Sequence, residues 1–163
     1  GFDVSEYLCH EGEATSQNIP AFMKEWGVDM TFTARGGIEG VEAVVSAPAR
    51  EVFLLQRKKT KVGAKLGKTT GWIHRTGLKN KGVQMIPSCT YDKIDDQGIH
   101  ITIDGAEKLL EVDNVIICAG QDPMRDLVEG LNKPHHLIGG ADVAAELDAK
   151  RAIDQGVRLA AEM

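Results

Sequence analysis

Residues 52–58 read Val-Phe-Leu-Leu-Gln-Arg-Lys, and this stretch decides the fold. Its first four residues form a continuous apolar run, which is typical of a strand buried on both faces of a sheet. A helical pattern follows over residues 66–81, and the apolar residues 83–86 predict a second strand. A strand–helix–strand unit implies two parallel strands joined by a right-handed crossover. The stretch therefore predicts an α/β domain.

More strands are predicted downstream of this unit. Residues 91–94 and 99–103 alternate apolar and polar side chains around Asp-Asp-Gln-Gly at 95–98, which is a hairpin signal. The remaining predicted elements are, in chain order, a strand at 109–112, a buried strand at 115–118, a short helix at 124–131, a strand at 136–138 and a helix at 142–161. This order predicts a Rossmann-like dinucleotide-binding domain with an antiparallel β-meander.

The beginning of the chain departs from the usual order of such a domain. Residues 1–8 already have helical spacing, and no N-cap residue precedes them. We therefore expect that the first strand and its G-x-G-x-x-G turn are missing from this sequence. The missing strand would lie between the strands at 52–55 and 115–118, and unpaired edges recruit other segments or other chains. We expect residues before Gly1, a second chain or the segment 41–45 to fill the gap, or the two strands to join directly.

Residues 12–49 form a long irregular stretch, which we interpret as an insertion with its own small packing. One short helix is predicted inside it, over residues 19–26. Asn18 is placed to cap the start of this helix, Pro20 lies in its first turn, and Gly27 is placed to end it.

The composition excludes several classes of protein. Lys plus Arg number 19 and Asp plus Glu number 24 in 163 residues, so the net charge is −5, whereas a general nucleic-acid binder is usually basic. No apolar run approaches the roughly 18 residues that a membrane span needs. The three cysteines are scattered without metal-ligand spacing, so we expect reduced thiols in a cytoplasmic protein. We therefore expect no nucleic-acid partner, no membrane partner and no metal site.

A basic loop directly follows the first predicted strand. Six cations occur within twelve residues of an acidic chain: Arg57, Lys58, Lys59, Lys61, Lys65 and Lys68. In a dinucleotide-binding fold, an acidic residue at this strand end binds the ribose 2′-hydroxyl of NAD, and a basic residue accommodates the 2′-phosphate of NADP. Arg57 and Lys58 stand where that acid would be, which favours NADPH over a merely solvated run of charge.

Other motifs have plainer interpretations. Residues 63–69 imitate a phosphate-binding P-loop but hold three residues, not four, before Gly-Lys-Thr, which disfavours a nucleotide triphosphatase. His135 and His136 have no carboxylate or cysteine at ligand spacing, so a structural role is favoured for them. Cys118 is predicted to be buried in an apolar run. Residues 139–142 end a predicted strand and open a helix, where glycines let a ligand approach and Asp142 is a good N-cap.

Longer strings of the sequence resemble a known family. They are Gln-Arg-Lys at 56–58, Leu-Gly-Lys-Thr-Thr-Gly-Trp-Ile-His-Arg at 66–75, Ile-Asp-Asp at 94–96, Val-Asp-Asn-Val-Ile-Ile-Cys-Ala-Gly-Gln at 112–121 and His-Leu-Ile-Gly-Gly-Ala-Asp-Val-Ala at 136–144. Together they resemble the C-terminal part of the bacterial NADPH-dependent 2,4-dienoyl-CoA reductases, in the old-yellow-enzyme and trimethylamine-dehydrogenase group. The resemblance covers essentially the whole chain.

The resemblance implies a multidomain parent enzyme. That family has an N-terminal β/α barrel with FMN, a 4Fe-4S cluster, and C-terminal FAD and NADPH domains. Electrons pass from NADPH through FAD and the cluster to FMN, which reduces the dienoyl thioester in unsaturated fatty acid β-oxidation. The resemblance implies that residues 1–133 are the NADPH-binding domain, with the insertion at 12–49, and that residues 134–163 are the C-terminal segment of the FAD domain. The rest of the parent chain is then the partner of this chain, and we expect this chain alone to catalyse no reaction.

The resemblance also implies roles for individual residues, none of them catalytic. The motif Gln56, Arg57 and Lys58 falls at the NADPH 2′-phosphate, with Lys61 as a weaker candidate. The positions carried over elsewhere are Gly1, as the last glycine of the NADPH turn; Ala119, Gly120 and Gln121, at a strand end lining the cofactor cleft; and Gly140 and Asp142, in the second FAD motif.

Two other functions stay open at the level of the sequence. One is the NAD(P)H-binding domain of another flavin enzyme, such as an amine dehydrogenase relative or an ene-reductase. The other is a non-catalytic domain that binds anions or a protein partner. Saturable binding of NADPH in preference to NADH would distinguish the cofactor-binding functions from the last one.

Overall fold

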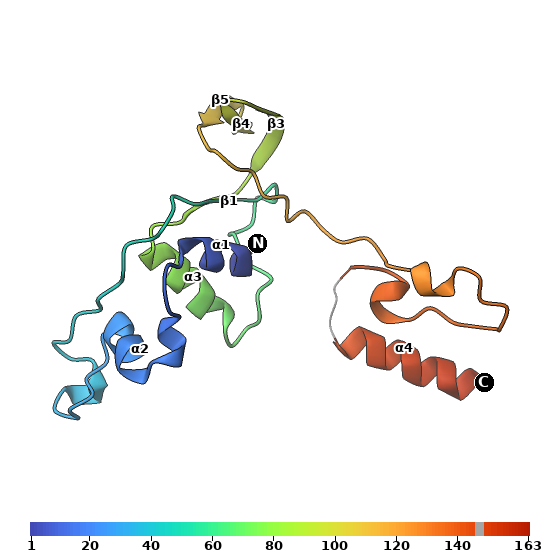
Figure 1. Ribbon diagram of the computed structural model, residues 1–163, viewed down its shortest axis with the longest axis horizontal. Coiled ribbons are helices and arrows are strands. Elements are labelled where there is room, and N and C mark those ends of the chain that lie inside the picture. Colours follow the sequence, from blue (N-terminus) through green and yellow to red (C-terminus); the bar gives the residue numbers. More distant parts are fainter. Residues whose placement is uncertain (146–148) are drawn as a thin grey trace. The chain divides into compact units, whose positions relative to one another are not determined.

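The computed structural model describes residues 1–145 and 149–163 (Figure 1). The chain divides into two compact units, Gly1–Val115 and Ile116–Met163. Each unit is described by itself. This division follows compactness alone, so the assignment of residues 1–133 and 134–163 to two cofactor domains stays a prediction.

A parallel pair of strands lies at the centre of the first unit. Strand β1 (Phe53–Leu55) pairs in parallel with β2 (Gln84–Ile86), and helix α3 (Gly71–Asn80) connects them. The predicted strand–helix–strand unit is confirmed, and the mixed helix and strand content is compatible with an α/β fold. The helix begins five residues later than predicted. The preceding residues form tight turns instead, in which the Ala64 N–H donates to Lys61 O and the Leu66 N–H donates to Gly63 O.

A small core forms where helix α1 (Phe2–Cys9) packs against α3. Its buried members come from both helices and from the residues next to the strands: Cys9, Val52, Leu78 and Val83. Leu78 is fully buried. A side-chain hydrogen bond also joins the two helices, because His74 Nδ1 lies 2.8 Å from Glu6 Oε1.

The insertion contains the helix that its sequence predicts. Helix α2 spans Ile19–Trp26, the Asn18 side chain accepts a hydrogen bond from the Ala21 N–H, and Gly27 ends the helix in the left-handed conformation with φ +66°. Two 3-10 turns flank it, η1 (Thr15–Gln17) and η2 (Arg35–Gly37). Residues 41–45, a candidate to fill the gap beside β1, form no strand.

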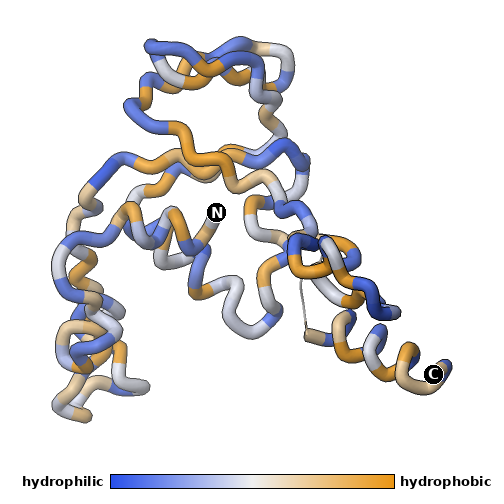
Figure 2. The backbone as a smooth tube through the Cα atoms, turned by 45° about the vertical axis from the view of Figure 1, so that its right-hand side comes forward, coloured by the Kyte–Doolittle hydropathy of each residue, from blue (hydrophilic) through white to orange (hydrophobic). Residues whose placement is uncertain are grey.

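An antiparallel sheet completes the first unit. Strands β3 (Cys89–Asp95), β4 (Gly98–Ile103) and β5 (Ala106–Leu110) form a meander, so the predicted hairpin around 95–98 and the third strand are confirmed. A second core lies at this sheet and also contacts the parallel pair. Its buried members are Cys89, Ile99, Ile101 and Leu110, and they are packed against Phe53, Leu55 and Ile86. Figure 2 colours the backbone by hydropathy and shows how hydrophobic and hydrophilic residues are distributed along these strands.

The predicted strands at 115–118 and 136–138 are wrong. Both segments are irregular, Ile117 is 78% exposed, and Cys118 is exposed rather than buried. Among the described residues, β1 pairs with β2 alone. An apolar run becomes a strand only where a neighbouring strand takes up its backbone hydrogen bonds and covers its side chains. The described residues offer these two segments no such neighbour.

The second unit is built around helix α4 (Ala149–Glu162). The predicted short helix at 124–131 is reduced to the 3-10 turn η3 (Asp126–Val128), and another 3-10 turn, η4 (Gly139–Ala141), packs against α4. Residues 142–145 were predicted to be helical but are not, and residues 146–148 lie outside the described part of the chain. Of the helices within residues 1–145 and 149–163, none combines the length and the apolar character that crossing a membrane requires.

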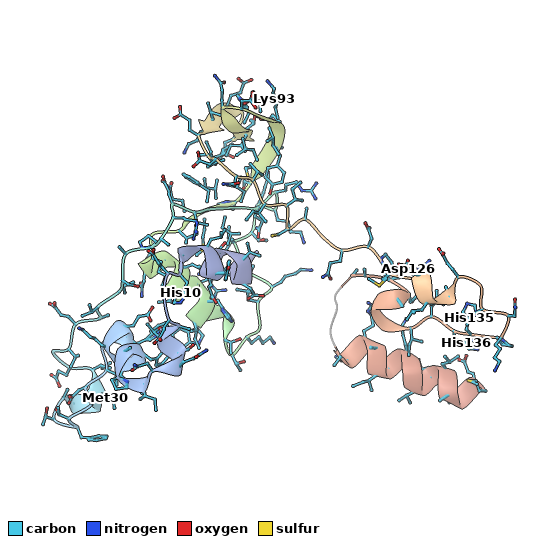
Figure 3. The ribbon with its side chains drawn as sticks, viewed as in Figure 1. His10, Met30, Lys93, Asp126, His135 and His136 are labelled. Atoms are coloured by element: carbon cyan, nitrogen blue, oxygen red, sulfur yellow. The ribbon has the colours of Figure 1, made fainter. Side chains whose placement is uncertain are left out.

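The Asp95 carboxylate at the β3–β4 turn is expected to titrate below an ordinary aspartate. Lys93 Nζ lies 2.7 Å from its Oδ2 (Figure 3 labels Lys93), the Gln97 N–H donates to its Oδ1 at 3.0 Å, and His100 Nε2 lies 3.1 Å from Oδ2. These contacts, with that of Lys93 the largest, lower the pKa of Asp95 from 3.8 to about 2.

The sign of the resulting pH dependence is fixed by the direction of this shift. Because the pKa is lower in the folded state, the stabilisation is present above about pH 4 and is lost as the pH falls through 2. An NMR titration of the carboxyl carbon measures the pKa directly. The variant Lys93→Met should raise it toward the ordinary value, and an unchanged pKa would contradict the part assigned to Lys93.

Candidate functional site

The basic loop begins where both strands of the parallel pair end. The Gln56 N–H donates to Ile86 O at 2.9 Å and so continues the pairing of β1 with β2, and Gln56 O accepts from the Cys89 N–H at 3.2 Å. Arg57 and Lys58 follow directly and are exposed. The structure therefore places these two predicted site residues at the carboxyl end of the parallel strands, where ligands bind in open α/β sheets.

The Gln56 side chain organises this loop from inside. Its Nε2 donates to Lys58 O at 3.0 Å, to Thr60 O at 2.8 Å and to Thr60 Oγ1 at 3.3 Å. The Ser88 N–H also donates to Lys58 O, at 3.2 Å. The amide nitrogen of Gln56 is turned into the loop, and the predicted contact of Gln56 with the cofactor stays a prediction. The hydrogen bonds hold the loop in one shape before any ligand arrives.

Three cations of the loop have no carboxylate partner in the part of the chain that the structure describes. Within the described residues, Arg57, Lys58 and Lys61 form no ion pair. Like charges gathered in this way repel one another, and an arriving anion relieves the repulsion. In a chain of net charge −5, such a cluster is a local site of attraction for a negatively charged group.

The first helix reaches the same loop. A Cβ atom added to Gly63 would lie 2.5 Å from Phe2 Cζ, so the ring of Phe2 packs directly on the backbone of Gly63. Gly1 caps α1, and its carbonyl accepts from the Ser5 N–H at 2.9 Å. The N-terminus of α1 and the loop that carries Lys61 are therefore neighbours. Free amides at a helix N-terminus favour negative groups, which is the same preference as that of the cations.

Tyr91 is a residue of this site that the sequence did not indicate. It lies on β3, two residues after Cys89, whose N–H bonds to Gln56 O. Burial, the largest effect, raises the pKa of the Tyr91 hydroxyl, and the positive charge of Arg57 acts in the opposite direction. Tyr91 is 44% exposed. Only the pairing of distant segments brings it within electrostatic reach of Arg57, so no local sequence signal could have identified it.

The other predicted site residues belong to the second unit. Ala119, Gly120 and Gln121 lie on an exposed irregular segment, and Gly140 lies in η4. These residues belong to a different unit from the basic loop, and their cofactor contacts stay predictions.

Asp142 does not cap the last helix as predicted. It follows η4 directly, and α4 begins at Ala149. Its Oδ2 accepts from Gln155 Nε2 at 2.9 Å, while Gln155 Oε1 accepts from the Gly139 N–H at 2.7 Å. Gln155 thus ties the glycine turn to α4 and leaves Asp142 held by its side chain. The 3-10 turn at 139–141 packs against α4.

His135 and His136 lie on an irregular segment of the second unit, both exposed (Figure 3). His135 Nδ1 lies 3.2 Å from Lys133 O, and the strand that was predicted to begin at His136 is absent. Among residues 1–145 and 149–163, no three His, Cys, Asp or Glu side chains gather as a group that could hold a metal ion.

Comparison with solved structures shows a likeness of fold. No protein-family model matches the chain. A solved structure of 2-naphthoyl-CoA reductase in complex with 2-naphthoyl-CoA superposes with a TM-score of 0.55 at 23% sequence identity. The match covers 66% of this chain and 16% of that one. At this identity the match shows a similar fold, and the chain corresponds to a small part of the length of that reductase.

Proposed function

We propose that this chain is the NADPH-binding module of a larger flavin and iron–sulfur oxidoreductase that reduces a 2,4-dienoyl-CoA thioester. The observation that carries the proposal is that Arg57, Lys58 and Lys61, at or just beyond the carboxyl end of β1, form no ion pair among the described residues. A cofactor with an extra phosphate on its adenine ribose is the natural ligand of such a cluster in this fold.

The residues at the loop fit the 2′-phosphate of NADPH. Arg57 would grip the phosphate with two parallel hydrogen bonds, and Lys58 and Lys61 would add charge. No carboxylate pairs with these three cations among the described residues, so their charges are available to the phosphate. When bound, NADPH supplies a hydride, and this chain's own residues bind and orient its adenosine end.

The assignment to a CoA-thioester reductase rests on two kinds of likeness. The sequence strings at 66–75 and 112–121 resemble the dienoyl-CoA reductases. Independently, about two thirds of the chain shares its fold with a small part of the structure of 2-naphthoyl-CoA reductase. The FAD contacts of Gly140 and Asp142 rest on the likeness of the sequence string at 136–144.

Equilibrium binding to the full chain tests the proposal. Calorimetric titration should show saturable binding of NADPH that is about tenfold or more tighter than that of NADH, since the two differ only by the charged phosphate. The preference should shrink as salt is raised from 0.05 to about 0.5 M, because exposed charges are screened. Equal affinities for the two cofactors would refute the NADPH assignment.

A further inference from the structure

We propose that two copies of this chain associate through Phe32, whose ring enters the cavity lined by residues 48–52 and 80–82 of the other copy. Phe32 lies in the loop that follows α2, within the insertion. The inference goes beyond the proposed function and does not depend on it.

Phe32 is held in a conformation that costs the chain free energy. Its φ is +60°, in the left-handed region that bulky side chains avoid. The residue is 92% exposed, so burial of its ring within the chain does not offset this cost. Strain that brings no gain in internal packing is typical of residues that contact a ligand or a partner.

The Asp29 side chain holds the loop in this shape. Its Oδ1 accepts from the N–H and the hydroxyl of Thr31, at 2.8 and 2.6 Å. Its Oδ2 accepts from the N–H groups of Thr33 and Ala34, both at 2.7 Å. These hydrogen bonds, with that of the Ala34 N–H the largest effect, hold the pKa of Asp29 well below its usual range. A ring presented by a loop fixed in this way loses little conformational freedom when it docks.

The same unit carries a cavity that can receive a ring. Its volume is about 410 Å³, and Pro48, Ala49 and Val52, just before β1, give it an apolar lining. Phe32 and the cavity both belong to the unit Gly1–Val115, so every copy of the chain has one ring and one cavity. In a two-fold dimer each surface is used twice, so two such contacts form at once.

Charge favours this contact over contact between two copies of the same loop. The segment 29–42, which includes Phe32, holds three acids and one base (Figure 3 labels Met30 in this segment). The cavity lining holds two bases and one acid, which are Arg50, Lys81 and Glu51. The Arg50 guanidinium donates to the carbonyl of Leu8 and forms no ion pair among the described residues. Surfaces of opposite charge attract each other and orient the two copies.

Sedimentation velocity of the full chain over a concentration series tests the inference. The unaltered chain should pass from monomer to dimer between about 10 µM and about 1 mM, the range expected of a small interface. Raising the salt to about 0.5 M should weaken the dimer, because the exposed charges are screened.

The variant Phe32→Gly separates docking from folding. Glycine adopts φ +60° without strain, so the midpoint of urea unfolding should rise, while dimerisation weakens about tenfold or more. Leu127→Ser is the matched control, because Leu127 is 90% exposed and lies on η3 of the second unit. This variant should dimerise like the unaltered chain. Ala49→Trp fills the cavity and should weaken the dimer while leaving Phe32 in place.

NMR spectra locate the contact without relying on a variant that fills the cavity. In ¹⁵N–¹H spectra, the amide signals of Ala49 and Gly82 should shift with concentration in the unaltered chain and stay fixed in Phe32→Gly. A second copy docked elsewhere would leave both signals unshifted in the unaltered chain, and this result would overturn the inference.

Three other results would also overturn the inference. One is a chain that stays monomeric over the whole concentration range. Another is a dimer that Phe32→Gly leaves unchanged or that Leu127→Ser weakens equally, since association would then not depend on this ring. The last is a lower urea midpoint in Phe32→Gly, which would show that Phe32 supports the fold of its own chain.

Discussion

Replacing Arg57 and Lys58 together by alanine is expected to weaken NADPH binding by about tenfold to a hundredfold and to leave NADH binding nearly unchanged. Both side chains follow β1 and are exposed without an ion-pair partner in the described part of the chain. Losing a charge-assisted hydrogen bond to phosphate costs about 1.5–3 kcal/mol. NADH carries no phosphate at this position, so it has no such contact to lose.

The control for this variant removes the same charge elsewhere. Lys79 on α3 and Lys108 on β5 are exposed lysines outside the basic loop. The double variant Lys79→Ala, Lys108→Ala lowers the net charge by two and should keep the preference for NADPH. Fluorescence or calorimetric titration measures the affinity for each cofactor of the unaltered chain and of both double variants. Equal losses of affinity for NADPH and NADH in the Arg57, Lys58 variant would contradict the binding of the 2′-phosphate by these two residues.

Substituting Gly98 by alanine is expected to destabilise the antiparallel sheet by about 3 kcal/mol or more. Gly98 opens β4 with φ +130°, a conformation that side chains rarely adopt. A Cβ atom there would lie 2.1 Å from Leu110 O and 2.9 Å from Val112 N. Both contacts are with backbone of the neighbouring strand or just beyond it, so relief requires β4 and β5 to separate.

Gly105→Ala is the matched control for this substitution. Gly105 has φ +83° in the turn between β4 and β5, but a Cβ atom there would meet nothing within 4 Å. The substitution should therefore lower the free energy of unfolding only by the cost of a left-handed backbone at a non-glycine residue, about 1–2 kcal/mol. Urea unfolding followed by circular dichroism compares the two. Equal destabilisation would contradict the close approach of Gly98 to Leu110.

Local signals in the sequence were sufficient where an element depends on its own residues. Asn18 and Gly27 predicted both ends of α2, because a cap bonds to amides three residues away and a left-handed glycine needs no distant partner. The β3–β4 hairpin was predicted for the same reason. Its turn residues at 96–97 lie between Asp95 and Gly98, which pair directly.

Apolar runs were a poorer guide where an element depends on partners. Residues 52–55 and 115–118 look alike in sequence, yet only the first contains a strand. Phe53–Leu55 has β2 beside it, joined through α3, so its backbone groups are paired. No strand of the described residues pairs with 115–118, and its isoleucines stay exposed. An apolar pattern in the sequence shows which residues can be buried, whereas backbone pairing with a neighbouring strand determines which of them form a strand.

The sequence by itself determined the chemistry of the candidate site: a run of cations after the first strand, with no acid to hold a ribose hydroxyl. Tertiary structure decided which groups can face a ligand there. Gln56 turns two carbonyls inward, the Cys89 hydrogen bond brings Tyr91 near Arg57, and the end of β2 holds Lys58 O. Residue type is written locally, but the direction of a peptide group depends on hydrogen bonds to segments far along the chain.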